Sequence, residues 1–592
     1  MATTLLPTET FAPPRIEVDR RADGTMLMRS AESLAPYPRS MAHAFRACAR
    51  EHPDRVLAGE RAPGADEWTL LTWGRARELA DAVAQSLLDH GLGPDRPLMV
   101  LSGNSLPHLI VTLGAYTAGV PVMPVSAAYS LQSHDHARLR AVAELCSPGM
   151  AFADDPDRFG AALDAIDDLV PAEAVGIEQL AAATPGPDVE RAFERLCPDS
   201  VAKILFTSGS TGAPKGVVNT HRMLCSNQQA MAQVWPFLRS DPPVLVDWLP
   251  WSHTFGGNHN LHQVLTFGGA LYIDAGKPVP AVFEHTVEAL RDVAPTIAYN
   301  VPAGWALLAD RLEADPDLAA RFFSRLRLMF YAAAALPQDV HDRLRALADA
   351  YADHPVPLTA SWGATETAPA ATSAHHEDAA CGSIGVPLPG VTVKLVPEHD
   401  GRHEIRVAGP NVTPGYHNDP DATAAAFDEE GFYRTGDAVA LLDPVDLAAG
   451  LRFDGRLAED FKLLSGTWVV VGTLRTALLS QSRGLLTDAV IAGHDRGYAA
   501  ALAWAAGGPA APDQAALRRG LAEALGRMNR GAGSARRIER ILLLAEPPNL
   551  DAGEITDKGY VNQRTVLERR AKAVERLYAE PPPEDVILAD PS

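Results

Sequence analysis

Cysteine is scarce in this chain and follows no pattern. Five cysteines occur among 592 residues, and no two of them form a Cys-x-x-Cys pair. This scatter argues against a disulfide framework and a zinc knuckle, and it is typical of a reducing compartment. We therefore expect a cytoplasmic protein. The cysteines are Cys48, Cys146, Cys197, Cys225 and Cys381.

Positive charge is also in deficit. The chain has 52 Lys and Arg against 74 Asp and Glu, a net charge of −22. A chain this acidic lacks the broad basic surface that holds nucleic acid, so we expect no nucleic-acid partner. An anionic small molecule would need locally placed donors, because the overall field repels it.

Long apolar runs that could cross a membrane are missing as well. The best candidate, residues 109–128, is uncharged but contains Gly114, Gly119, Pro121 and Pro124. A membrane span needs about 20 mostly apolar residues in one helix, so this stretch predicts a buried helix followed by a strand. The first residues also lack the basic start and apolar run of a signal peptide.

Alternating helix-like and strand-like segments dominate the sequence. The length exceeds what one hydrophobic core supports, so at least two domains are expected. From Tyr37 to about Asp454, Ala-rich helical segments alternate with short apolar strands, such as a helix over 75–91 and a strand over 97–103. This alternation predicts an α/β fold with largely parallel sheets.

The pattern changes twice towards the C-terminus. Short β runs around residues 390–407 predict a small antiparallel β subdomain, and the chain after Arg456 predicts a compact α+β domain. We place the domains at 1–455 and 456–592. The first 30 or so residues and the segment from Pro581 are expected to be loosely ordered.

The strongest motif is ILFTSGSTGAPKGVV, residues 204–218. It is not a Walker A loop, because its lysine follows proline and no Ser or Thr comes after it. Small residues still let backbone N–H groups approach phosphate oxygens, and hydroxyls and a lysine add donors. A Gly/Ser linker is the alternative, but linkers seldom follow an apolar strand and end in Pro-Lys-Gly. The candidate phosphate-binding residues are Thr207, Ser208, Gly209, Ser210, Thr211, Gly212 and Lys215.

This loop resembles the phosphate loop of the adenylate-forming (AMP-binding) superfamily of acyl-CoA synthetases, luciferases and peptide-synthetase adenylation domains. Further motifs follow in that family's order over roughly residues 40–575. The segment 248–253 resembles the part of the family beside the acyl pocket, where His253 matches the residue that gates the site. A metal cluster of His253 with His259 and His262 is the weaker alternative.

Three more segments match family motifs on the nucleotide side. In residues 361–367 the match implies that Thr365 contacts a nucleotide phosphate and that Glu366 holds Mg²⁺, which commonly takes one or two carboxylates plus phosphates. Taken alone, this segment would be a helix start. The alanines of 331–337 occupy the adenine-side turn, with Ala334 as the candidate. In residues 433–437 the match implies that Asp437 binds ribose, with Arg456 contacting ribose or phosphate.

The segment after Arg456 departs from the family pattern. Ala458 stands where most members have lysine, and Glu459 takes the place of the interdomain hinge, although Asp460 stays open as the hinge. The loop 465–468 resembles the border of the pantetheine channel, with Gly466 as the candidate.

The segment 551–560 resembles the C-terminal loop that delivers the family's catalytic lysine. Lys558 is the match, although it lies between Asp557 and Gly559 instead of in the usual Gly-Lys context. Without this resemblance, a lone lysine in a loop would be a solvated surface charge.

The resemblance implies an ATP-dependent acid–CoA ligase that uses Mg²⁺ and coenzyme A, with a C-terminal domain that rotates between two half-reactions. EDFKLLSGTWV and GEITDKGYVNQR are most similar to feruloyl-CoA synthetase and related aromatic-acid ligases, so we expect an aromatic acid such as ferulate. The alternatives are an adenylation enzyme loading a separate carrier protein, a fatty acyl-CoA ligase, a luciferase-like oxygenase and a non-catalytic binder. A homodimer is left open.

Overall fold

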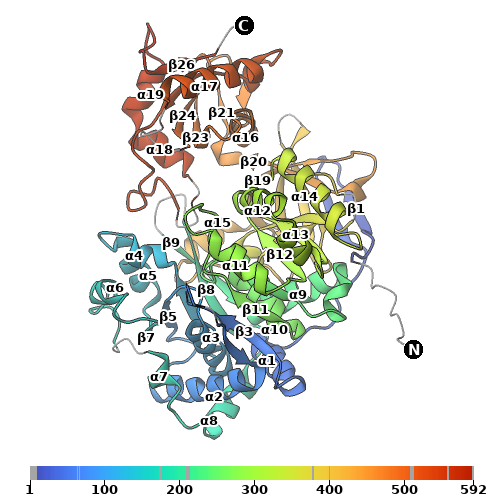
Figure 1. The fold of residues 1–592 in the computed structure, drawn as a ribbon, viewed down its shortest axis with the longest axis vertical. Coiled ribbons are helices and arrows are strands. Elements are labelled where there is room, and N and C mark those ends of the chain that lie inside the picture. The colour runs from blue at the N-terminus through green and yellow to red at the C-terminus, as the bar shows by residue number, and fades with distance from the viewer. Residues whose placement is uncertain are drawn as a thin grey trace.

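Two bodies of unequal size make up the chain in the computed structural model (Figure 1). The structure describes residues 10–62, 64–65, 67–171, 176–208, 214–376, 379–398, 401–506, 513–556, 559 and 561–589. The smaller body, orange to red in Figure 1, is formed by the C-terminal segment and stands beside the larger one.

The first sheet of the large body is five-stranded, in the order β7-β5-β6-β8-β9. Its first four strands are parallel, and β9 returns antiparallel to β8. Strands β5, β6 and β7 are fully buried apolar segments, as expected where helices cover both faces. The strands span Leu98–Leu101 (β5), Val122–Val125 (β6), Met150–Ala153 (β7), Val201–Ser208 (β8) and Pro214–Thr220 (β9).

The buried helix–strand unit predicted over 109–128 is confirmed. It consists of α3 (Leu106–Ala118) and β6, and the side chain of Ser105 caps the start of the helix. Helix α3 packs closely on α2 (Trp73–Asp89), and Gly114 permits this approach. A Cβ at Gly114 would lie only 2.5 Å from Cγ1 of Val83. Within the described residues, no helix is long and apolar enough to span a membrane.

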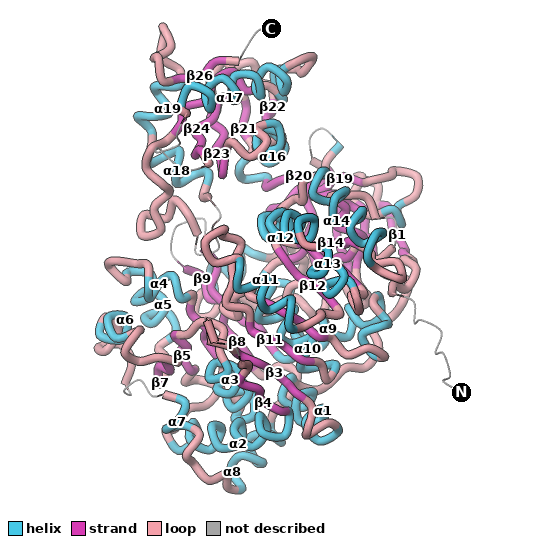
Figure 2. Tube along the Cα trace, in the orientation of Figure 1, coloured by secondary structure: helices cyan, strands magenta, loops and turns pink. Residues whose placement is uncertain are grey.

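A second, four-stranded sheet has the order β10-β11-β3-β4, with β4 antiparallel. Helices lie around the strands of the large body (Figure 2). The strands are β3 (Val56–Glu60), β4 (Thr69–Thr72), β10 (Val244–Asp247) and β11 (Ala270–Ile273). The helices are α1 (Met41–Glu51), α4 (Ala127–Leu131), α5 (Ala137–Cys146), α6 (Gly160–Asp164), α7 (Ile177–Leu180), α8 (Pro187–Arg195), α9 (His221–Val234) and α10 (Leu261–Phe267).

The third sheet has eleven strands in the order β1-β2-β17-β18-β19-β20-β16-β15-β14-β13-β12. Its strands are β1 (Ile16–Arg20), β2 (Met26–Ser30), β12 (Ile297–Asn300), β13 (Leu328–Tyr331), β14 (Leu358–Gly363), β15 (Ala370–Ser373), β16 (Ser383–Pro387), β17 (Thr392–Pro397), β18 (His403–Ala408), β19 (Tyr433–Leu441) and β20 (Leu451–Arg456). Its helices are α11 (Glu284–Asp292), α12 (Pro302–Ala314), α13 (Pro316–Phe323), α14 (Gln338–Tyr351) and α15 (Pro420–Ala426).

This sheet corrects two predictions. The β strands expected around 390–407 exist, but they do not form a separate sheet, because β16 pairs with both β20 and β15 and so joins them to the parallel strands. The first 30 or so residues are not loosely ordered from Thr10 onward. Strands β1 and β2 form a hairpin that pairs with β17, and burial of Met26 and Met28 stabilises it.

The C-terminal body has its own four-stranded sheet, β23-β24-β25-β26, and a short ribbon of β21 and β22. The segment from Pro581, expected to be loosely ordered, is not so as far as residue 588, because β26 pairs with β25 and buries Val586 and Ile587. Residues 590–592 lie outside the described residues. The strands are β21 (Phe461–Lys462), β22 (Trp468–Val469), β23 (Leu486–Ala492), β24 (Ala499–Ala505), β25 (Ile538–Leu543) and β26 (Val586–Leu588). The helices are α16 (Val471–Gln481), α17 (Gln514–Asn529), α18 (Gln563–Arg569) and α19 (Ala571–Leu577).

Candidate active site

The predicted phosphate loop connects the two strands of a hairpin. Strands β8 and β9 pair antiparallel, with Thr207 opposite Lys215 and Ser208 opposite Pro214. The strand expected before the loop is therefore confirmed. The loop residues Gly209, Ser210, Thr211 and Gly212 lie outside the described residues.

Tyr416 connects this hairpin to the candidate metal ligand. The Lys215 ammonium lies 4.9 Å from the centroid of the Tyr416 ring, and the Tyr416 hydroxyl donates to Oε1 of Glu366 at 3.1 Å. Burial, followed by the charge of Glu366, raises the pKa of Tyr416, so the phenol stays protonated and acts as a donor. The sequence analysis missed Tyr416, since its local pattern does not distinguish it from a core aromatic residue.

Glu366 lies in a short 3₁₀ helix, η3 (Thr365–Thr367), directly after β14. Thr365 and Glu366 are both buried, although neither side chain belongs to the apolar core. A single carboxylate beside the phosphate hairpin fits Mg²⁺, which completes its coordination with phosphates and water.

Asp437 lies on β19, opposite Arg456 on β20. The indole N–H of Trp362 donates to Oδ2 of Asp437 at 3.0 Å, and Nε of Arg456 lies 3.5 Å from Oδ1. Within the described part of the chain, Oδ1 is buried and accepts no hydrogen bond. Burial raises the pKa of Asp437, and the Arg456 guanidinium opposes that shift. A buried carboxylate oxygen without a donor is suited to accept a hydrogen bond from a ligand hydroxyl.

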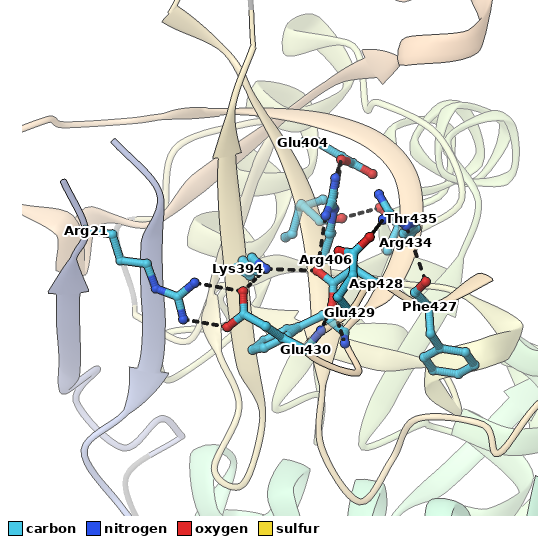
Figure 3. Close-up of polar contacts among 12 residues, drawn as sticks. Arg21, Lys394, Glu404, Arg406, Phe427, Asp428, Glu429, Glu430, Arg434 and Thr435 are labelled. Carbon is cyan, nitrogen blue, oxygen red and sulfur yellow. Dashed lines mark hydrogen bonds and ion pairs between the residues drawn. The ribbon is translucent and has the colours of Figure 1, made fainter. Parts of the chain in front are cut away.

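An ion-pair network holds the turn that precedes β19 (Figure 3). One carboxylate oxygen of Asp428 accepts from Lys394 at 2.9 Å and from Arg406 at 3.1 Å. Its other oxygen accepts the N–H groups of Glu430 and Phe432. Burial alone would raise the pKa of Asp428, but these donors outweigh it and lower the pKa to about 2.

Replacing Asp428 with asparagine is expected to lower the free energy of unfolding by about 3 kcal/mol at pH 7. It removes the buried carboxylate that pairs with both Lys394 and Arg406, and it leaves the buried Lys394 paired only with the partly exposed Glu430. The folded pKa lies below the unfolded value of about 4. The stabilisation is therefore complete above pH 4 and is lost as the pH falls towards 2. Urea unfolding at several pH values would measure this. Glu429→Gln, at an exposed carboxylate, is the control, and equal effects of the two variants would contradict the prediction.

The acyl-side candidate His253 precedes an unusual helix. Residues Phe255–Asn260 form a π-helix (η2), a geometry often found at functional sites. The N–H of Gly257 donates to the His253 carbonyl oxygen at 2.8 Å, so the π-helix fixes the backbone at His253. A Cβ at Gly256 would clash with the Leu249 carbonyl oxygen, which explains the glycine.

The other histidines of the proposed metal alternative lie in the core. His259 stacks on Phe330 with a centroid distance of 5.3 Å, and burial lowers its pKa to about 4. His262 lies with Nε2 at 3.0 Å from the Tyr116 hydroxyl. On the adenine side, Ala334 is exposed in the turn after β13, next to Ala333, which has a left-handed φ of 78°.

The hinge candidates lie between the two bodies. Asp460 Oδ2 accepts from Arg402 of the large body at 2.8 Å, and its Oδ1 accepts the N–H of Val471 at the start of α16. Glu459 makes neither contact, and burial raises its pKa. Gly466 has a left-handed φ of 82° in an exposed loop.

Lys558 lies outside the described residues, but the segment around it contacts the large body. The Asp551 carboxylate accepts the N–H of His134 at 3.1 Å. Ile555 and Val561 form an antiparallel bridge on either side of the lysine. This segment and the stretch around His134 together line a cleft of about 580 Å³.

Comparison with known proteins decides the family. The model of the AMP-binding enzyme family matches residues 45–417, and that of the AMP-binding enzyme C-terminal domain matches residues 462–581. The chain belongs to the AMP-binding enzyme family. This confirms the predicted superfamily and an enzyme of that kind.

Several curated relatives are named CoA ligases. The 3-[(3aS,4S,7aS)-7a-methyl-1,5-dioxo-octahydro-1H-inden-4-yl]propanoyl:CoA ligase of Mycobacterium tuberculosis is 30% identical, over 70% of this chain and 80% of its own length. Benzoate–CoA ligase of Thauera aromatica is 30% identical over 56% of this chain. The probable CoA ligase CCL8 of Humulus lupulus is 29% identical over 40% of this chain. The matches span 60% and 41% of the lengths of these last two relatives.

Solved structures share the fold. An anthranilate CoA ligase in complex with anthranoyl-AMP superposes with a TM-score of 0.71 at 18% identity, covering 91% of this chain and 99% of that one. The adenylation domain of a carboxylate reductase from Mycobacterium chelonae gives a TM-score of 0.70 at 21% identity, covering 91% of each chain. The predicted fold class, a large N-terminal α/β domain and a smaller C-terminal domain, is confirmed.

Proposed function

We propose that this chain is an ATP-dependent carboxylic acid–CoA ligase. The observation that carries the proposal is the grouping of Lys215 and Glu366 around Tyr416, together with Asp437, whose Oδ1 lies beside Arg456 and accepts no hydrogen bond from the described residues. The first group offers charges for a metal-bound triphosphate, and the second offers an acceptor for ribose. Relatives named as CoA ligases support the choice of reaction.

The reaction has two steps. The substrate carboxylate attacks the α-phosphorus of ATP, forming an acyl-AMP and releasing pyrophosphate. The thiol of coenzyme A then attacks the acyl carbon, forming a thioester and releasing AMP. Bound Mg²⁺, held by Glu366, would neutralise charge on the phosphates.

The residues divide between the substrates as the family resemblance implies. Thr207 to Gly212 and Lys215 hold phosphate oxygens with hydroxyl, backbone and ammonium donors. Asp437 accepts a ribose hydroxyl, with Arg456 beside it, while Thr365 contacts phosphate and Ala334 borders adenine. His253 lies on the acyl side.

The C-terminal domain serves both steps. Lys558 stabilises charge at phosphorus in the first, and a rotation about Glu459 or Asp460 brings Gly466 to the pantetheine in the second. The contacts of Asp460 with both bodies favour it over Glu459 as the hinge.

We infer that the acid is aromatic, of the hydroxycinnamate or benzoate kind. Support comes from the feruloyl-ligase resemblance of residues 459–469 and 553–564 and from the relative named benzoate–CoA ligase. A fatty acyl-CoA ligase and a carrier-loading adenylation enzyme are the alternatives.

An acid panel in a CoA-dependent AMP-release assay tests both parts. Ferulate, coumarate or a benzoate should turn over at least about tenfold faster than palmitate, because a site shaped for a ring does not align a long chain for attack. Faster turnover of palmitate would contradict the aromatic class. Pyrophosphate release without any thioester on addition of coenzyme A would instead favour a carrier-loading enzyme.

A further inference from the structure

Lys203 is a buried lysine that has no carboxylate partner among the residues the structure describes. It lies on β8, four residues before Thr207, and its exposed fraction is 1%. Among the described residues, no carboxylate forms an ion pair with it, and its ammonium donates a hydrogen bond to the Gly257 carbonyl oxygen at 3.1 Å. Burial lowers the pKa of Lys203 to about 7. An unpaired buried cation destabilises a fold, so the residue calls for an explanation beyond stability.

Its titratable neighbours do not compensate the charge. His108 and His262 are imidazoles on which its charge acts, and that charge adds to burial in lowering the pKa of each ring. Burial lowers the pKa of each, so both rings are neutral at physiological pH. The Lys203 side chain is therefore held mainly by the carbonyl group of the π-helix.

The acceptor of this hydrogen bond belongs to the segment that positions His253. The N–H of Gly257 donates back to the His253 carbonyl oxygen, one turn earlier. A Cβ at Gly257 would clash with the Trp251 carbonyl oxygen and would lie 3.1 Å from Nζ of Lys203. The close approach of the lysine to this turn therefore requires the glycine.

A second hydrogen bond joins the same two elements beside the first. Asn219 on β9 is opposite Lys203 in the hairpin register, and its Oδ1 accepts from the Asn258 side chain at 2.6 Å. Gln228 on α9 donates to the Asn258 and His259 carbonyl oxygens at 2.9 and 3.1 Å. We name the Lys203–Gly257 and Asn219–Asn258 contacts together the hairpin–helix clamp.

The clamp connects the two halves of the proposed reaction. Its hairpin side continues into the phosphate loop, and its π-helix side follows His253 on the acyl side. We propose that Lys203 is a positioning residue, which holds the acyl-side segment in register with the phosphate hairpin so that the substrate carboxylate meets the α-phosphorus in line. This inference rests on the proposed ligase function.

The physical reason is that attack at phosphorus is sensitive to placement. A misplacement of about 1 Å can lower a rate about 100-fold, even when the responsible residue does not touch the reacting atoms. A shift between hairpin and π-helix would leave nucleotide binding largely intact, because the described nucleotide candidates lie on the hairpin, in the turn after β13, in η3, and on β19 and β20. It would chiefly affect the first half-reaction, in which acid and ATP must be aligned.

Lys203→Met in the full chain tests the inference. Pyrophosphate release should fall tenfold or more in kcat, while the Kd for ATP, measured by titration calorimetry, changes less than about threefold. With supplied acyl-AMP and coenzyme A, thioester formation should stay near the wild-type rate. The Tm should rise or stay unchanged, because an unpaired buried charge has been removed.

Lys394→Met is the matched control. Lys394 is also buried, but it is paired with Asp428 and Glu430 (Figure 3), far in sequence from the clamp. Its loss should lower the Tm and leave kcat for pyrophosphate release unchanged. Lys203→Met should thus lose activity without losing stability, and Lys394→Met should lose stability without losing activity.

Three results would overturn the inference. Wild-type kcat in Lys203→Met would show that the clamp does not position the acyl side. A fall in Tm with equal losses in both half-reactions, in Lys203→Met and also in Lys203→Gln, would show a structural role only. A wild-type chain that releases no pyrophosphate with any acid, while still binding ATP, would defeat the proposed function itself, and the inference would fall with it.

Discussion

Lys558→Ala is expected to lower ATP-dependent pyrophosphate release about 100-fold or more. In the proposed mechanism its ammonium stabilises the negative charge that grows on the phosphoryl oxygens as the acid attacks, and deleting a preorganised charge contact has an effect of this size. In the second step the departing AMP is held mainly by Asp437 and Arg456. Supplied with synthetic acyl-AMP and coenzyme A, the variant should therefore form thioester at a near-normal rate.

The two half-reactions can be measured separately on the same preparations. Lys572→Ala, an exposed lysine on α19, is the matched control and should retain both rates. Gly466→Leu should show the reverse defect, because it would crowd the proposed pantetheine channel while adenylation proceeds. Equal losses of both half-reactions in Lys558→Ala and Gly466→Leu, or full adenylation in Lys558→Ala, would rule out the division of labour between two conformations.

The segment around Lys558 contacts the large body in this structure. Asp551 accepts a hydrogen bond from the backbone of His134, a residue 417 positions earlier, so the C-terminal loop touches the large body in this conformation. The contact is small and exposed, so it can break at low cost if the domain rotates. The ion pair of Arg402 with Asp460 is buried and would remain close to any rotation axis at that point.

Local sequence patterns predicted the parts of the site that local chemistry determines. The apolar strand before a Gly/Ser-rich loop predicted β8, and the uncharged stretch 109–128 predicted a buried helix and strand. Both predictions are confirmed because hydrophobic periodicity and turn residues act over a few positions. Composition alone wrongly predicted loose order at the two termini. At the C-terminus, β26 is short, but it buries Val586 and Ile587 against an existing sheet.

Contacts between residues that are distant in sequence could not be predicted from local patterns. Tyr416 meets Glu366 across 50 positions, and Lys203 meets Gly257 across 54. No local pattern encodes such a pair, because each partner would be ordinary in its own segment. The buried lysine could have been suspected, since a charge within an otherwise apolar strand is rare, but its partner could not.

Glu366→Gln is expected to lower pyrophosphate release about 100-fold at limiting Mg²⁺. The amide keeps the size of the side chain and can still accept the Tyr416 hydroxyl, so the fold should be retained. It lacks the negative charge that would hold the metal against the triphosphate. A bound metal of this kind stabilises the charge of the transition state by several kcal/mol. The rate should be measured over a range of Mg²⁺ concentrations at saturating ATP and acid.

Tyr416→Phe distinguishes the effect of losing the hydrogen bond to Glu366 from the effect of losing the metal ligand. It removes one hydrogen bond to Glu366 but keeps the ring beneath the Lys215 ammonium, so its effect should be about tenfold or less, the range of one net hydrogen bond. The two variants should therefore differ in Mg²⁺ dependence: excess Mg²⁺ should partly restore Glu366→Gln and should not change Tyr416→Phe. Normal turnover of Glu366→Gln at limiting Mg²⁺ would show that the metal is held elsewhere, and Glu366 would then only orient Tyr416 beside the phosphate hairpin.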